Sequence, residues 1–318
     1  MQAISVLTVT VSLTTVFWWP VEQPAQPAGF KHAGVVEAWH DYRDRLTFGK
    51  GQTLALVDDG CRMSMPEWQA VMPDGRPKVR VTYDAVDGDN DPKHEGRGYH
   101  GSTIGIPSSV NHGGKWGVAY NNQIAVVRGN ECCHCSINDS RKSLAAALQW
   151  VLDHHREYSI TTVNLAPVDD LEHGSPVATE IDAKLEALRK ANIWVSAPAG
   201  NHKFTNGISW PACQLSCFAI GAVRPGSSDV VHLDRHEKVA LLVPASATSS
   251  SNAIACGAAI ILREAIEKSG YDWSKDGTTL PDAMMAIFQK TGAEVADPAV
   301  EGRVFRRLDL AAALKHVF

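Results

Sequence analysis

The sequence predicts an α/β fold built on a doubly wound, mostly parallel β-sheet, and three observations lead to this prediction. Short apolar runs of about five or six residues recur beyond residue 50, as expected of strands buried on both faces. Apolar stripes at helical spacing lie between some of these runs, an alternation typical of doubly wound sheets. The chain has 318 residues, 44% of them hydrophobic, which suffices for one domain with a substantial core.

The predicted strands are the apolar runs, rich in Val, Ile and Ala and bounded by polar or glycine-containing segments. In chain order they span 53–57, 124–128, 161–166, 193–197, 218–223 and 239–243.

Three apolar stripes predict helices. The first has Ser143 as its candidate N-cap, the second has Pro176 in its first turn, and the third ends at Gly270. The stripes consist of Leu144, Leu148, Val151, Leu152 and His155; of Val177, Ile181, Leu185 and Leu188; and of Ile254, Ala258, Ile261, Leu262 and Ala265.

The first 28 residues differ in character from the rest. Residues Ala3 to Trp19 carry no charged side chain, and a Pro-rich stretch of small residues follows. This pattern is typical of a signal peptide cleaved near Ala25 or Ala28, so we expect a secreted or periplasmic protein with a domain over 29–318. No Lys or Arg precedes the apolar part, and its Val and Thr residues leave a buried first strand as the alternative.

The charge and hydropathy of the chain exclude two classes of function. A formal net charge of -5 argues against nucleic-acid binding, which needs a basic patch. No stretch reaches the roughly 20 apolar residues of a membrane span. Nothing in the sequence predicts an oligomeric state.

Four polar residues fall at strand ends or in glycine-rich loops, where active sites of α/β sheets collect. Asp58 follows the first strand, Asn201 follows the run WVSAPAG, and Ser249 begins the third helix. His100 lies in the loop Gly98-Tyr99-His100-Gly101-Ser102. Taken singly, each has an ordinary structural alternative. Asp58 could form a turn, His100 could be a surface histidine, Asn201 could terminate a strand and Ser249 could cap a helix.

Together, the four side chains meet the needs of acyl transfer. A serine hydroxyl becomes a nucleophile when an imidazole takes its proton, and a carboxylate orients that imidazole. An asparagine amide can donate to the oxygen that becomes negative.

In order and local sequence, these residues resemble the subtilase family, the subtilisin and kexin group of serine proteases, from about residue 50 to the C-terminus. The family order Asp, His, Ser is matched, and Gly257-Ala258-Ala259 sets the register that selects Ser249 over Ser250 and Ser251. The matching segments are TLALVDDG, VDGDNDPKHEGRGYHGSTIG, GVAYNNQIAVVRG, WVSAPAGN, ATSSSNAIACGAAIIL and EGRVFRRLDLAAAL.

The resemblance implies a subtilisin-like three-layer α/β/α fold and a serine endopeptidase acting on polypeptides. It implies Asp58, His100 and Ser249 as the catalytic triad and Asn201 as the oxyanion donor. It also implies that Ala166, Pro167 and Val168 bind substrate, because they stand in the run that pairs with substrate backbone in the family.

Several departures from the family pattern bear on activity. Ala247 replaces the glycine of Gly-Thr-Ser, and the proline that usually follows in the helix is missing. Val168 replaces a glycine and could narrow the cleft. These departures keep open a second interpretation, a catalytically impaired subtilase that binds peptides or a partner protein. A third is an esterase using the same triad.

The seven cysteines would permit up to three disulfides and one free thiol in an exported protein. We expect Cys256 to be free because it lies in an apolar helical pattern. The remaining pool is Cys61, Cys132, Cys133, Cys135, Cys213 and Cys217. Ligands in the run Cys132-Cys133-His134-Cys135 are too closely spaced to surround zinc, which favours disulfides or thiols there.

No cofactor is required by the predicted mechanism. The run Asp87-Gly88-Asp89-Asn90-Asp91 offers oxygen ligands for a structural calcium ion, with a solvated turn as the alternative. Asp169 and Asp170, near the predicted substrate segment, could favour basic substrates electrostatically.

Overall fold

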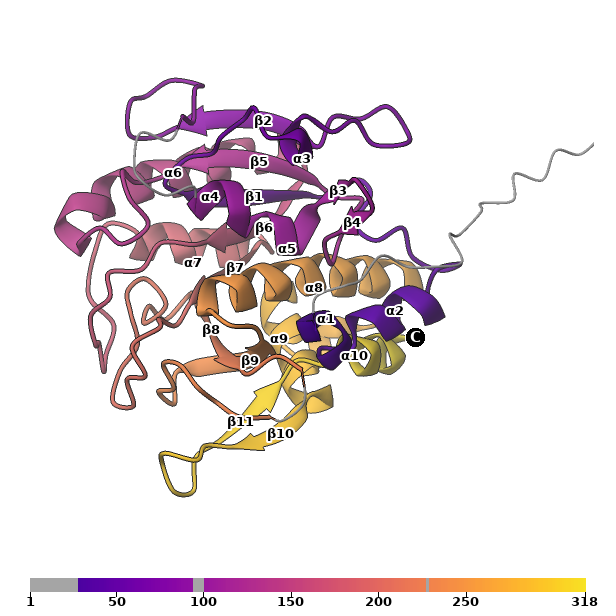
Figure 1. Ribbon diagram of the computed structural model, residues 1–318, viewed down its shortest axis with the longest axis vertical. Coiled ribbons are helices and arrows are strands. Elements are labelled where there is room, and N and C mark those ends of the chain that lie inside the picture. The colour runs from indigo at the N-terminus through magenta and orange to yellow at the C-terminus, as the bar shows by residue number, and fades with distance from the viewer. Residues whose placement is uncertain (1–27, 94–99, 227–228) are drawn as a thin grey trace, which may run out of the picture.

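Among the described residues, nine strands form one sheet in the order β10-β11-β9-β8-β7-β6-β1-β5-β2 (Figure 1). The computed structural model describes residues 28–93, 100–226 and 229–318. Neighbouring strands pair in parallel except β10 and β11, which are antiparallel. The strands are β1 (Thr53–Asp58), β2 (Val79–Asp84), β5 (Gln123–Arg128), β6 (Ile160–Leu165), β7 (Trp194–Pro198), β8 (Phe218–Val223), β9 (Val239–Pro244), β10 (Ala293–Ala296) and β11 (Val304–Arg307).

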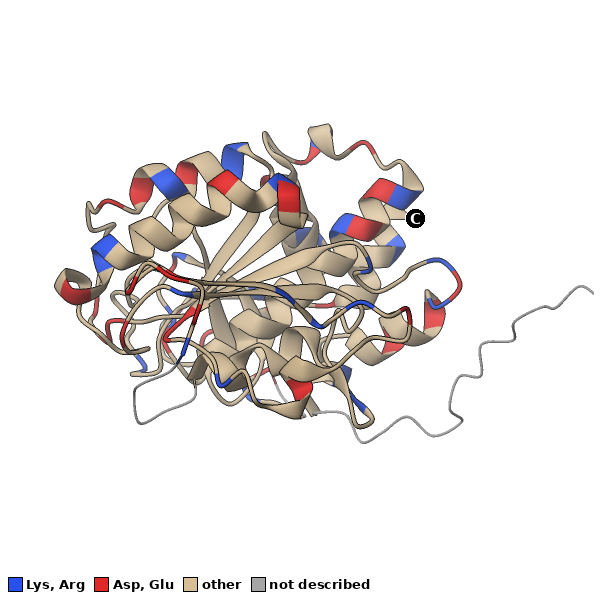
Figure 2. Ribbon diagram, turned by 90° about the horizontal axis from the view of Figure 1, so that it is seen from above, with Lys and Arg blue, Asp and Glu red and all other residues tan. Residues whose placement is uncertain are grey.

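Helices cover both faces of this sheet, as Figure 2 shows. The side chains of β1 alternate between two cores: Leu54 and Leu56 pack with the helices on one face, Ala55 and Val57 with those on the other. The first face carries α1 (Ala28–His32), α2 (Val35–Asp41), α8 (Thr248–Ser269), α9 (Leu280–Thr291) and α10 (Leu310–Val317); the second carries α6 (Ile137–Tyr158) and α7 (Asp182–Lys190). This arrangement confirms the predicted mostly parallel sheet with flanking helices.

Shorter elements lie between these strands and helices along the chain. They are α3 (Pro66–Gln69), α4 (His100–Ile104), α5 (Ile106–Ser109), the 3-10 helix η1 (Trp273–Lys275) and the hairpin of β3 (Asn111–His112) and β4 (Lys115–Trp116).

All six predicted strands are present, with boundaries shifted by at most one residue. The sequence analysis missed the three other strands of the nine-stranded sheet. The missed strand β2 is at the edge of the sheet and mostly half-buried, so it lacks the continuous apolar run of a central strand. Strands β10 and β11 are four residues each, too short to show a pattern.

The third predicted helix is confirmed as α8, and Gly270 ends it in the left-handed conformation with φ 70°. The predicted start of the first helix was wrong. The helix α6 begins at Ile137 with Ser136 as N-cap residue, and Ser143 lies inside it, donating its hydroxyl to Ser140 O at 3.0 Å.

The predicted start of the second helix was also wrong. Its helix, α7, begins at Asp182, so Pro176 and Val177 precede it. The Gln214 side chain bonds both the N–H of Val177 (2.9 Å) and its carbonyl (2.6 Å). The bond to the carbonyl takes up the acceptor that a helix starting here would have used.

One disulfide is present among the described residues, between Cys132 and Cys135, whose Cα atoms are 5.4 Å apart. Cys256 is free and buried, as predicted. Of the six cysteines in the pairing pool, Cys61, Cys133, Cys213 and Cys217 are free thiols, so fewer disulfides form than the three that the sequence permits.

The predicted export segment, residues 1–28, lies outside the described residues except for Ala28, and its cleavage stays a prediction. No described helix has both the length and the apolar character needed to cross a bilayer.

Candidate active site

Asp58 and His100 meet at the carboxyl end of the sheet. Asp58 is the last residue of β1 and its side chain is 2% exposed. Its Oδ2 lies 2.7 Å from His100 Nδ1, while its Oδ1 accepts the N–H of Asp59. His100 begins α4, which packs against both β1 and α8. The carboxylate is therefore placed to fix the orientation of the imidazole ring.

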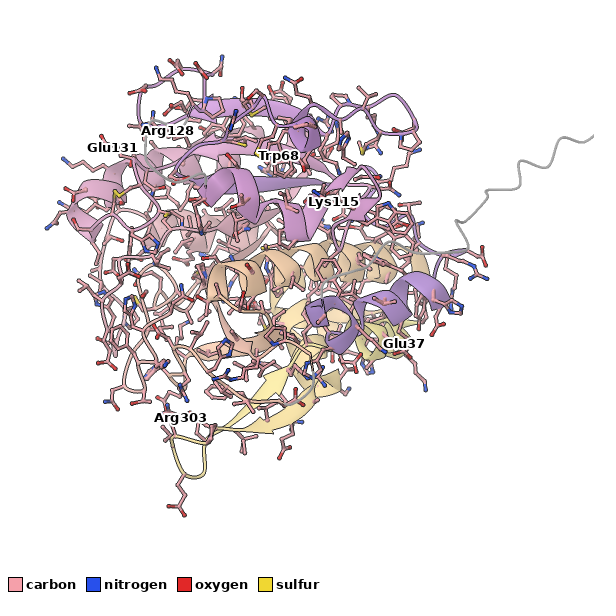
Figure 3. All side chains as sticks on the ribbon, viewed as in Figure 1. Glu37, Trp68, Lys115, Arg128, Glu131 and Arg303 are labelled. Atoms are coloured by element: carbon pink, nitrogen blue, oxygen red, sulfur yellow. A yellow bond between two sulfur atoms is a disulfide. The ribbon has the colours of Figure 1, made fainter. Side chains whose placement is uncertain are left out.

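Two neighbours fix α4 in this position. Asp59 Oδ1 accepts the N–H of Gly101 at 3.0 Å. The indole N–H of Trp68, labelled in Figure 3, donates to Ser102 O at 3.0 Å. The two residues that follow His100 in its helix are thus each held by a hydrogen bond from outside the helix.

The charge around His100 favours its protonated form. Burial of the ring lowers its pKa, but the charge and hydrogen bond of Asp58, with the charge of Asp59, outweigh burial and raise the pKa above the ordinary value of 6.5. The two carboxylates therefore stabilise the imidazolium cation that forms when His100 accepts a proton.

Ser249 lies in the first turn of α8, directly after β9. It is 8% exposed, and its hydroxyl has no hydrogen-bond partner among the described residues. Ser251, by contrast, donates its hydroxyl to Val243 O at 2.9 Å and is fully buried. The Ser251 hydroxyl is therefore occupied by a structural hydrogen bond, whereas the Ser249 hydroxyl remains available for reaction.

The start of α8 is tied to the ends of β6 and β7. Asn252 Nδ2 donates to Asn164 Oδ1 at 2.7 Å and to Ser196 O at 3.0 Å. In Figure 3, Arg128, the last residue of β5, marks the same end of the sheet. The candidate residues thus gather where the parallel strands end, as such sheets predict.

Asn201 is bonded to the residue before Ser249. Its Oδ1 accepts the backbone N–H of Thr248 at 3.0 Å and the Thr248 hydroxyl at 3.1 Å. Since a backbone N–H donates only to the oxygen, these bonds fix the amide orientation. Nδ2 has no hydrogen-bond partner among the described residues, so it can donate to a reacting oxygen.

The predicted substrate segment is more enclosed than expected. Ala166, Pro167 and Val168 are all buried. The N–H of Ala166 donates to Val57 O and that of Val168 donates to Cys133 O, at 3.0 and 2.9 Å. Proline has no N–H. Backbone pairing of a substrate with this segment would therefore use its carbonyl groups or displace Cys133.

A second histidine–carboxylate pair lies beside His100, and the sequence analysis missed it. His134 Nδ1 is 2.7 Å from Asp170 Oδ2, and the rings of His100 and His134 are 6.5 Å apart. His202 Nδ1 lies 3.6 Å from the other oxygen of Asp170. These residues lie far apart in the sequence, so no local spacing could have indicated the cluster.

Asp169 does not present a free carboxylate to a substrate, so the predicted preference for basic substrates stays a prediction. Its buried carboxylate is 2.6 Å from His173 Nε2 and accepts the N–H groups of Trp210 and Leu171. It is fully engaged within the protein. Asp170, at the edge of the candidate site, is the more accessible of the two.

The run proposed to bind calcium does not present a free set of oxygen ligands. Asp87 Oδ2 is 2.9 Å from Arg128 Nη1, which also binds Asp84. Asp89 Oδ1 accepts the N–H of Asp91. Within the described part of the chain, no group of three or more His, Cys, Asp or Glu side chains is placed to hold a metal ion. The Asp87 carboxylate is thus paired with a guanidinium, and binding of calcium by this run stays a prediction.

The nearby thiols are poor rivals to Ser249 as nucleophiles. Burial, reinforced by the charges of Asp58 and Asp59, raises the pKa of Cys133 to about 12. Burial raises the pKa of Cys61 to about 12 as well. Both thiols are therefore protonated near neutral pH, and the thiol form is a weak nucleophile.

Known proteins resemble this chain in family and in fold. A model of the subtilase family matches residues 49–291. Among solved structures, a cold-adapted subtilisin-like serine proteinase superimposes with a TM-score of 0.61 at 19% identity, covering 82% of this chain and 89% of that one. No curated protein sequence matches this chain at a significant level. The structural match concerns the fold, while the family model covers the four segments that carry Asp58, His100, Asn201 and Ser249.

Proposed function

Because this chain belongs to the subtilase family, we propose that it is a serine endopeptidase whose triad is Asp58, His100 and Ser249. The hydrogen bond of 2.7 Å between Asp58 and His100 is the observation that supports this most directly. It joins two segments that the sequence separates by 42 residues, in the geometry that an imidazole base requires.

In the proposed reaction, Ser249 Oγ attacks the carbonyl carbon of a peptide bond while His100 Nε2 takes its proton. The ring is bonded to Asp58 through Nδ1, which leaves Nε2 as the nitrogen that can take the proton. His100 then gives the proton to the departing amine, forming an acyl-enzyme and a free amino terminus. Water then attacks the acyl ester. His100 takes a proton from this water and returns it to Ser249 Oγ, which releases the acid product.

The negative oxygen of each tetrahedral intermediate needs donors. We assign this role to Asn201 Nδ2 and the backbone N–H of Ser249. Asn201 suits it because its Oδ1 is held by Thr248, which leaves Nδ2 available as a donor. All groups in this mechanism come from the chain, so the proposal requires no cofactor.

A second candidate function is peptide binding without catalysis. Two observations favour it: Val168 N–H is occupied by Cys133, and His100 and Ser249 are not hydrogen-bonded to each other. The retained bond between Asp58 and His100 speaks against it, and a loose contact between base and nucleophile is common before substrate binds.

A fluorophosphonate probe separates the two. It should label the wild-type protein and fail to label Ser249→Ala, while Ser250→Ala should be labelled like the wild type. Folded wild-type protein that resists the probe would favour the binding function. Parallel assays on peptide and ester substrates would distinguish an endopeptidase from an esterase.

Export is proposed on the N-terminal sequence alone. Mass spectrometry of the protein from its native host should find a mature amino terminus close to Ala25 or Ala28. An intact Met1 would refute export by this route.

A further inference from the structure

The turn that carries Asn201 is held from two opposite sides. Thr248 bonds it on one side, through the Asn201 side chain and through its hydroxyl, which accepts the N–H of Gly200 at 3.2 Å. On the other side lies Asp234, a residue with no part in the triad and 0% exposed.

Asp234 contacts the turn at both of its ends. Its Oδ1 accepts the backbone N–H of Phe204 at 3.0 Å, and its own N–H donates to Gly200 O at 3.3 Å. The next residue, Arg235, donates its N–H to Phe204 O at 2.9 Å. The turn is thus bonded to Asp234 at both ends, through the carboxylate at Phe204 and through the backbone N–H at Gly200.

The backbone at Gly200 fits this close approach. Its φ is 116°, a conformation that residues with a side chain rarely adopt. A Cβ there would lie 2.1 Å from Asp234 Oδ2 and 2.6 Å from Ser209 Oγ. The residue preceding Asn201 therefore lies directly against the carboxylate, with no room between them.

The carboxylate is costly to bury at this place. Among the described residues it has no Lys or Arg ion-pair partner, and Asp234 Oδ2 and Ser209 Oγ are buried without a hydrogen-bond partner. Burial raises the pKa of Asp234 to about 6, although the N–H groups of the turn act to lower it. A buried acid with so few compensating contacts is a candidate for a functional role.

We propose that Asp234 is a positioning residue for the reaction: by accepting N–H groups of the turn, it fixes the direction in which Asn201 presents its amide. This inference rests on the proposed function of Asn201 as oxyanion donor. It adds a residue that acts through another and does not touch the substrate.

The test combines Asp234→Ala with Asn201→Ala. If Asp234 acts through Asn201, Asp234→Ala should lower kcat about 10-fold and leave KM little changed. This loss is smaller than the 10²–10³-fold fall in kcat that follows removal of an oxyanion donor, because Asn201 is still present. In the Asn201→Ala background the same change should cost less than about twofold, because the group it positions is gone. Asp234→Asn retains an acceptor oxygen and should restore most of kcat.

Glu264 supplies the matched control. It is also a buried carboxylate that gathers backbone N–H groups of a turn, those of Thr47 and Gly49, but it lies far along α8 from Ser249. Glu264→Ala should cost stability, and any effect on kcat should be the same with or without Asn201.

Hydrogen exchange of the substrate-free protein gives a readout that does not depend on activity. Amides of residues 200–204 should exchange faster in Asp234→Ala than in wild type or Glu264→Ala. Equal losses of kcat in both backgrounds, or unchanged exchange in the turn, would overturn the inference. A wild-type protein that neither cleaves nor reacts with the probe would refute the proposed protease, while exchange still decides whether Asp234 fixes the turn.

Discussion

The side-chain oxygen of Asn201 accepts two hydrogen bonds from Thr248, one from its backbone N–H at 3.0 Å and one from its hydroxyl at 3.1 Å. Thr248 immediately precedes Ser249 on α8. The proposed nucleophile and the proposed oxyanion donor are therefore positioned by the same residue, although they lie 48 positions apart in the sequence. This coupling leads to the first prediction.

Replacing Thr248 with valine should impair catalysis without abolishing it. The change keeps the size and the backbone bond of Thr248 but removes the hydroxyl that bonds Asn201 and Gly200. Loss of about 1 kcal/mol of hydrogen bonding to Asn201 predicts that kcat falls about 5-fold. Asn201→Ala should lower kcat by 10²–10³-fold. Steady-state cleavage of a peptide measures both. Thr279→Val removes a hydroxyl that caps α9 and should leave kcat unchanged; a Thr248→Val enzyme as fast as wild type would contradict the coupling.

The rate of cleavage should rise with pH as His100 loses its proton. Only the neutral ring can accept the proton of Ser249, and Asp58 and Asp59 raise its pKa. The acid limb of kcat/KM should therefore have an apparent pKa above 6.5. Asp58→Asn removes that charge, so the limb should move to lower pH and kcat should fall about 10⁴-fold, the loss known for the corresponding change in a serine protease. A limb that stays in place would show that another group titrates.

The same shift affects stability with a defined sign. A histidine whose pKa is higher in the folded state binds its proton more tightly there, so it stabilises the fold below its unfolded pKa. This contribution is lost as pH rises through the folded value. Denaturant unfolding of wild type and of His100→Gln should show that the unfolding free energy of wild type, relative to the variant, decreases toward alkaline pH.

The buried ion pair at the end of β5 predicts a large loss of stability. Arg128 and Asp84 have side chains 5% and 0% exposed and lie 2.8 Å apart. Arg128→Met would leave Asp84 buried without its partner and should lower the free energy of unfolding by about 3 kcal/mol or more. Asp87→Asn, which alters the more exposed partner of Arg128, should cost less than about 1 kcal/mol. Urea unfolding of the two variants checks this, and equal losses would argue against it.

The positions of the strands and of the candidate residues could be predicted because they depend on local patterns. A strand buried on both faces gives a continuous apolar run, and Asp58 stands where the first such run ends. The helix α8 was predictable because its apolar stripe ends at a glycine in the left-handed conformation.

Other features depend on contacts between distant segments and leave no local signal. Pro176 and Val177 fit a helix start until Gln214 binds the backbone of Val177. The pairing of His134 with Asp170 joins residues 36 positions apart. Asp234 is one acid among many in the sequence, and only its contacts with the turn at Gly200 and Phe204 distinguish it.

Gly101 is predicted to be essential for the contact between His100 and Asp58. A Cβ at Gly101 would lie 2.1 Å from Gly60 O and 3.1 Å from Asp58 Cβ. A backbone oxygen cannot yield as a side chain can, so Gly101→Ala should push the start of α4 away from β1. Since a misplacement of about 1 Å can cost 10²-fold in rate, we expect at least that loss of kcat.

Gly105→Ala is the control for this change, because it lies at the other end of α4 and would meet only side-chain atoms of Trp68 and Leu56, at 3.0 and 3.1 Å. It should reduce stability by about 1–3 kcal/mol through overpacking while leaving the rate of probe labelling close to wild type. NMR of the His100 Nδ1 proton should show its hydrogen bond to Asp58 intact in Gly105→Ala and lost in Gly101→Ala. A Gly101→Ala protein that keeps this proton signal and its full rate would show that β1 and α4 can separate without disturbing His100.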